Sequence, residues 1–167
     1  MFSSTELASY EQEGTLQLFV NSFTVMSIDQ SFLDTVIKIN IIAPAENSLT
    51  ILNLITDDEN FALNTEIHSN GNLAIIANVV LEILNGTTID AHQVFITNYK
   101  LNEEQLINSA IQFDITNELT IINHGSISAK KAPSAIATNK LINHGTIASC
   151  IDSSNLIGLD SKKHDKS

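Results

Sequence analysis

The chain of 167 residues is long enough to bury the core of one domain, and its 19 aspartate and glutamate side chains outnumber eight lysines, with no arginine. A net charge of −11 without clustered cations excludes nucleic acids and anionic membranes as partners, because a protein binds both by neutralising phosphates. Charged residues make up only 16% of the chain, while the abundant Ile, Val, Leu, Phe and Thr favour strands.

The N-terminal 47 residues are predicted to form a cap followed by irregular strands. Ser3 and Glu6 have the spacing of a capping box, which predicts a short helix over residues 4–12. Such a helix would cover strand edges at the open end of a repeat structure. The segment lacks the cationic start and the continuous apolar stretch of a secretory signal. The location of the protein therefore stays open between the cytoplasm and export through a non-standard signal.

Alternation of apolar and polar side chains after this cap predicts strands, with a turn of helix at residues 31–36. The strands are expected over residues 15–20, 23–25 and 37–41. Pro44 then marks a break, and the repetitive texture begins near residue 48. The predicted organisation is a cap over residues 1–47, a solenoid over 48–159 and a charged, disordered tail over 160–167.

A hexapeptide in the second half of the chain occurs twice. The segment Ile122–Ile127 reads INHGSI and returns twenty residues later at Ile142–Ile147 as INHGTI, with serine replaced by threonine as the only change. A repeat in register at this interval indicates structural units stacked on one another. Weaker copies of the pattern apolar–Asn–three residues–apolar begin at Leu84 and Leu101. The residues predicted to carry the repeat are Asn85, Asn102, Asn123, Gly125, Ile127, Asn143, Gly145 and Ile147.

These units suit a parallel β-helix. Each coil of such a fold consists of short strands joined by turns, and apolar side chains at alternate positions point into the lumen. The asparagines are expected at corners, where each amide can hydrogen-bond to the equivalent amide of the next coil. The glycines beside them are expected to accept positive φ. The residues predicted to face the lumen are Ile89, Ala91, Ile122, Ile127, Ala129, Ile142 and Ile147.

The pattern Asn-x-Gly-x-Ile-x-Ala, clearest at residues 121–129 and 141–149, resembles a known group of repeats. It is similar to the repeats of filamentous-haemagglutinin-type adhesins and autotransporter passengers, and the similarity covers roughly residues 82–150. The resemblance implies a right-handed parallel β-helix that binds a partner at a cell surface or after secretion.

An alternative all-β fold also fits the pattern. Short strands with turns about every 8–12 residues describe a β-sandwich or jelly roll as well as a solenoid. Residues 129–137, which contain Lys130, Lys131 and Pro133, are expected to form a loop that leaves the coil. The longest apolar stretch, Leu73–Leu84, is too short to span a bilayer and contains Asn78 and Glu82, so no membrane insertion is expected and the protein is predicted to be soluble.

Few residues suggest metal or nucleophilic chemistry. His124 and His144 are expected on adjacent coils about 4.8 Å apart, but a zinc site needs at least a third ligand and the sequence places none. A polar stack at the surface is therefore expected. The acidic run at residues 57–59 lacks the spacing of a calcium loop and is expected to be a solvated turn. Cys150 is the only cysteine and is expected to be a buried, inert thiol.

Two classes of function remain. The first is a non-enzymatic interaction or structural protein, adhesin-like in character, that binds a protein or a glycan through a solenoid face or extends by end-to-end packing. The alternative is a carbohydrate-active β-helix enzyme with paired carboxylates, for which Glu103, Glu104 and Glu118 are candidates. A groove with convergent carboxylates would favour the enzyme, and a flat surface of Asn, Ser and Thr would favour binding. We assign no catalytic, cofactor-binding or metal-binding residue.

The charged tail over residues 160–167 is expected to influence whether the chain self-associates. Its lysines can shield the strand edges of the last coil by charge. We therefore expect the chain to be monomeric when residues 160–167 are present and to self-associate when they are removed.

Overall fold

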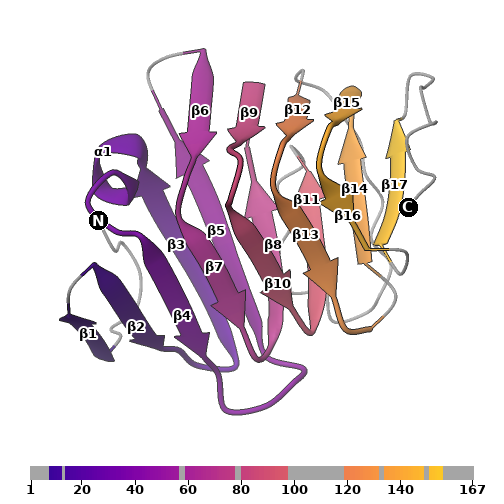
Figure 1. Cartoon of the computed structure of the whole chain (residues 1–167). Coiled ribbons are helices and arrows are strands. Elements are labelled where there is room, and N and C mark those ends of the chain that lie inside the picture. The colour runs from indigo at the N-terminus through magenta and orange to yellow at the C-terminus, as the bar shows by residue number, and fades with distance from the viewer. Residues whose placement is uncertain are drawn as a thin grey trace.

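The computed structural model describes residues 8–12, 14–56, 59–77, 80–97, 119–131, 134–148 and 151–155. They form a β-solenoid of about five stacked turns, built almost entirely from parallel strands (Figure 1). The stack runs from β2 near the N-terminal end to β17 near the C-terminal end. The predicted parallel solenoid is confirmed, and the sandwich alternative is wrong.

Successive coils add their strands to three sheets, here called sheets A, B and C. Sheet A contains, in spatial order, β1 (Ala8–Gln12), β2 (Thr15–Phe19), β4 (Lys38–Ile42), β7 (Glu66–Ser69), β10 (Thr88–Ala91), β13 (Ser126–Ala129) and β16 (Thr146–Ile147). Sheet B contains β3 (Phe23–Asp29), β5 (Leu49–Ile55), β8 (Asn72–Ile76), β11 (Gln93–Thr97), β14 (Ser134–Thr138) and β17 (Ile151–Asn155). Sheet C contains β6 (Asn60–Leu63), β9 (Val80–Ile83), β12 (Thr120–Asn123) and β15 (Lys140–Asn143).

The core fills the lumen between the sheets, and aliphatic side chains from successive coils stack in register. Alternate residues of each strand point inward, so one residue per coil adds to each row. The inner row of sheet A consists of Leu16, Ile39, Ile67, Ile89, Ile127 and Ile147. All of its members are buried in one cluster.

The predicted lumen residues are only partly correct. Ile89, Ala91, Ile127 and Ile147 are buried, and Ala129 is half-buried and packs against the same core. The prediction is wrong for the residue before each repeat asparagine, Ile122 and Ile142, because both are half-buried. Their neighbours Ile121 and Leu141 are buried in their place.

The alternation of a strand explains this error. Asn123 is fully buried, so its side chain takes an inward position and Ile121, two residues earlier, takes the other. Ile122, between them, must then face outward. Hydrophobicity alone would place Ile122 in the lumen and Asn123 on the outside, which is the opposite of what the structure has.

The N-terminal end also differs from prediction. Residues 8–12 form a strand, β1, rather than part of a helix, and β1 pairs antiparallel with β2. Pairing satisfies the backbone groups at the outer edge of sheet A, which outweighs the local preference of the capping-box sequence. Parallel pairing of coils begins with β2 and β4, so the stack begins at Thr15 and the predicted boundary at residue 48 falls inside it.

A short helix, α1 (Gln30–Leu33), lies where a turn of helix was predicted at residues 31–36. It takes the place of a sheet C strand in the first coil. Within the described residues, no helix is long and apolar enough to cross a membrane. Several predicted features lie outside the described residues, namely Asp57, Asp58, Asn102, Glu103, Glu104, Glu118, Cys150 and the tail over residues 160–167.

Candidate functional site

The two strong repeats meet at the corner between sheets C and A, where Asn123 and Asn143 stack. They are register partners on β12 and β15. The Nδ2 of Asn123 donates to the Oδ1 of Asn143 at 2.8 Å. Each asparagine Oδ1 also accepts from the backbone N–H two residues later, at 3.1 Å from Gly125 and 3.2 Å from Gly145. The predicted amide ladder is present, and it fixes the turn of each coil.

The glycines of this corner serve a different purpose from the one predicted. Among the described residues, the glycines with positive φ are Gly14 and Gly86. Gly125 and Gly145 are needed because coils approach closely: a Cβ on Gly125 would overlap the carbonyl oxygen of Thr87, and one on Gly145 would overlap that of Gly125. A side chain at either position would force two coils apart.

The weaker upstream copy is out of register. Asn123 lies opposite Ile83 and Ser126 lies opposite Thr88, so the upstream turn is longer than the turn of the repeat. Asn85 falls in this longer turn, exposed, and does not lie beneath Asn123. The ladder of asparagines is therefore seen between Asn123 and Asn143, and it does not extend to Asn85.

The histidines of the repeat stack on the outside of the same corner. The rings of His124 and His144 lie 5.0 Å apart between centroids and are inclined by 14°. The Nε2 of His124 is 3.6 Å from the Oε2 of Glu82. Among the residues that the structure describes, no group of three or more His, Cys, Asp or Glu side chains is arranged to hold a metal ion.

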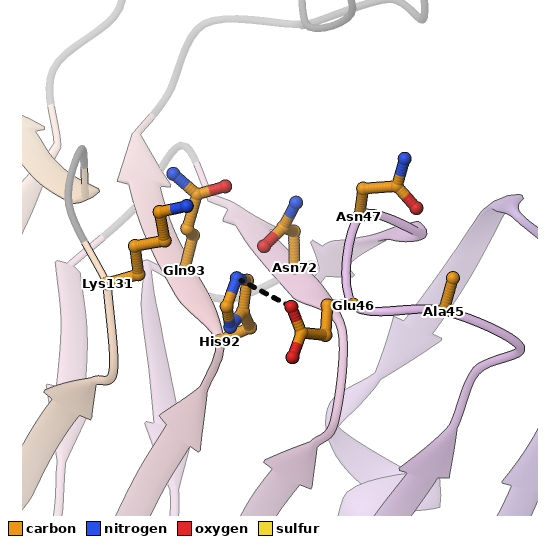
Figure 2. A pocket seen from close by; sticks show the side chains of 7 residues that line it. All are labelled: Ala45, Glu46, Asn47, Asn72, His92, Gln93 and Lys131. Carbon is orange, nitrogen blue, oxygen red and sulfur yellow. Dashed lines mark ion pairs between the residues drawn. The ribbon is translucent and has the colours of Figure 1, made fainter.

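A polar pocket lies along the corners between sheets A and B, where the connections after β4, β10 and β13 and the first residues of β8 and β11 contribute side chains (Figure 2). We call it the corner pocket. It has a volume of about 370 Å³. Its lining residues are Ala45, Glu46, Asn47, Asn72, His92, Gln93 and Lys131.

The corner pocket combines a carboxylate, an imidazole, amides and an ammonium group. The Nε2 of His92 lies 3.8 Å from the Oε1 of Glu46, and Figure 2 shows the two side chains pointing toward one another. The Oδ1 of Asn72 is buried and has no hydrogen-bond partner. A buried acceptor without a donor costs free energy, so binding of a partner that shifts this side chain and donates to Asn72 would offset that cost. Sequence reasoning missed this pocket, because its residues come from four successive coils and are far apart in the sequence.

A second cluster lies on the outer face of sheet A around His68. Its Nδ1 lies 2.8 Å from the Oδ2 of Asp90 on the next coil, and its Nε2 lies 2.9 Å from the Oε1 of Glu66. Burial of the imidazole lowers the pKa of His68, but hydrogen bonds and charge from Glu66 and Asp90 outweigh burial and raise the pKa above its usual 6.5. Lys38 lies beside Glu66 in the sheet. The sequence offered no partner for His68, because Asp90 is brought beside it only by coil stacking.

This cluster predicts a pH-dependent stability. A raised pKa in the folded state means that the stabilisation is complete below pH about 6.5 and is lost as the pH rises through the folded-state value. Urea unfolding at pH 6 and pH 8.5 should therefore give a lower free energy of unfolding at the higher pH. The variant His68→Gln should lose most of this difference, whereas Asn40→Ala on the neighbouring strand should keep it. An equal pH dependence in wild type and His68→Gln would contradict the assignment.

Comparison with known proteins adds no assignment: no family model matches the chain, and no curated protein matches its sequence. The resemblance to haemagglutinin-type repeats stays a prediction that rests on the motif residues, chiefly those at 121–129 and 141–149.

Proposed function

We propose that this protein is a non-enzymatic binding module, adhesin-like in character, that recognises a polar partner such as a glycan or a protein loop through the corner pocket. The observation that carries the proposal is the buried, unpartnered Oδ1 of Asn72 within a pocket that also holds Glu46, His92 and Lys131. Such a set of fixed donors and acceptors suits a ligand rich in hydroxyl or amide groups.

The outer face of sheet A supports binding rather than hydrolysis. One of its outward rows runs Gln17, Asn40, His68, Asp90 and Ser128 in register across five strands. Within the part of the chain that the structure describes, Glu66 and Asp90 lie together on this face, and the imidazole of His68 lies between them, bonded to both. Carboxylates tied to one imidazole are poorly placed to act on opposite sides of a glycosidic bond.

A glycan array and a pull-down with the purified chain, with hydrolysis monitored in parallel, test the proposal. We expect a retained ligand and no released product. The variant Asn72→Leu should fold with equal or slightly higher stability, because it removes an unsatisfied acceptor, but should bind the retained ligand at least about tenfold more weakly. The matched control Asn40→Leu, on the outer face of sheet A, should bind normally. Unchanged binding by Asn72→Leu would contradict the site, and steady product release would favour the enzyme.

A further inference from the structure

The outer face of sheet A is hollowed near its corner with sheet B, over the coils that contain β2, β4 and β7. We call this hollow the sheet A groove. Its volume is about 460 Å³, and its lining includes Gln17, Asn40, Ile42, His68, Asn70 and Lys130. The sheet A groove and the corner pocket have no lining residue in common, so each can be altered without the other.

Two polar side chains of the groove are held in place by the protein itself. The Oδ1 of Asn70 accepts from the N–H of Ala43 at 2.7 Å, and its Nδ2 donates to the carbonyl oxygen of Ala43 at 2.9 Å. Both ring nitrogens of His68 are bonded to carboxylates, at 2.8 Å to Asp90 and 2.9 Å to Glu66. A ligand would therefore meet a preformed wall on this side of the groove.

Three other polar side chains of the groove are free to bind a ligand. Within the described part of the chain, no hydrogen bond or ion pair engages the carboxamides of Gln17 and Asn40 or the ammonium group of Lys130. Gln17 and Asn40 are register partners on β2 and β4, so their backbones lie about 4.8 Å apart. Each carboxamide both donates and accepts, so the pair can bond to two neighbouring hydroxyl groups.

Apolar side chains border these amides. Ile42 lines the groove, and its register partner Phe19 lies two positions after Gln17, on the same face of β2. Phe19 is 45% exposed and Ile42 is 37% exposed, although both are large and apolar. A sugar ring has an apolar C–H face and hydroxyl groups around its edge, so it can pack on these two side chains with its hydroxyl groups toward the amides.

We propose that the sheet A groove is a second binding site, independent of the corner pocket, and that it binds an uncharged saccharide. Phe19 and Ile42 pack against the sugar ring. Gln17 and Asn40 bond to adjacent hydroxyl groups, and Lys130 donates to a further sugar oxygen. The ligand is uncharged, because the two carboxylates bonded to the imidazole of the groove, together with the net charge of −11, disfavour an acidic sugar.

Nuclear magnetic resonance of the isotope-labelled full chain tests the proposal through the side-chain amide signals of Gln17 and Asn40. The probes are neutral tetrasaccharides of glucose, galactose, mannose or N-acetylglucosamine, with tetragalacturonate as the acidic probe. Each is titrated to about 10 mM, because a few net hydrogen bonds support a Kd of about 1 mM. We expect at least one neutral probe to shift both signals. No shift with any neutral probe, or shifts confined to Asn72 and Gln93 of the corner pocket, would overturn the proposal.

Two pairs of variants then locate the bound saccharide. Ile42→Ala and Ile55→Ala make the same change at an exposed isoleucine that ends a strand. Ile42→Ala should bind the responding saccharide at least about fivefold more weakly, and Ile55→Ala should bind it as wild type does. Gln17→Leu should also weaken this binding, whereas Asn72→Leu, which impairs the corner pocket, should not. Equal affinities within either pair would overturn the groove as the site and leave the corner pocket untouched.

Discussion

Replacement of Gly145 by alanine should destabilise the protein by about 3 kcal/mol or more, because the new methyl group would meet backbone atoms that cannot move aside. A Cβ on Gly145 would overlap the carbonyl oxygen of Gly125 and lie 2.8 Å from the carbonyl carbon of His124. These atoms belong to the preceding coil, so relief of the clash would pull apart the paired strands on both sides. Gly125→Ala should behave in the same way, since its Cβ would meet Thr87 and Leu84.

Gly86→Ala is the matched control for this prediction. Gly86 has a φ of +90° and open space around its Cβ position. Its replacement should cost only the backbone strain of a left-handed residue, about 1–2 kcal/mol. Urea unfolding of the three variants measures the difference. If Gly145→Ala costs no more than Gly86→Ala, the close approach of the coils at this corner is refuted.

Ile127→Ala should cost about 2–5 kcal/mol, because it removes a buried side chain from the middle of a packed row. Ile127 is fully buried and lies between Ile89 and Ile147 on the neighbouring coils. Since these neighbours are held by their own strands, they cannot close over the space that the shorter side chain leaves. The loss should appear as a lower urea midpoint with an unchanged slope.

Ile122→Ala makes the same chemical change five residues earlier on the outer face of β12. Ile122 is half-buried and faces away from the lumen, so its truncation should cost less than about 1 kcal/mol. Equal losses for Ile122→Ala and Ile127→Ala would mean that the inward and outward faces of this coil are assigned incorrectly.

The solenoid could be predicted because the sequence pattern that specifies it is short and occurs twice in register. Asn123 and Asn143 carry the same neighbours at a fixed interval, and an amide ladder is a direct physical reason for such a repeat. The inward direction of Asn123 could not be predicted, because asparagine is usually exposed and only its ladder makes burial favourable. The assignment of Ile122 to the lumen failed for that reason.

The polar clusters could not be predicted, because coil stacking brings together residues that are far apart in the chain. Asp90 reaches His68 across one coil, and Glu46 reaches His92 across two. The coils differ in length, so register partners do not recur at a fixed interval in the sequence. Ile39, Ile67 and Ile89, for example, are register neighbours at unequal intervals. No fixed period in the sequence could have placed them. The amide of Gln30 hydrogen-bonds to the backbone of Ala62, which lies 32 residues away, and this contact could not be predicted for the same reason.

The stacked solenoid requires a fixed register between one coil and the next, and cysteine cross-linking tests that register directly. Ser126 and Thr146 are register partners on β13 and β16, so their Cα atoms lie about 4.8 Å apart, within the range that a disulfide spans. Ser128 and Thr146 are two positions out of register, about 8 Å apart, which is too far. In a Cys150→Ser background, mild oxidation of the folded chain should cross-link the pair at 126 and 146 and leave the pair at 128 and 146 reduced. Cross-linking of the second pair as readily as the first, or of neither, would contradict the stacked coils.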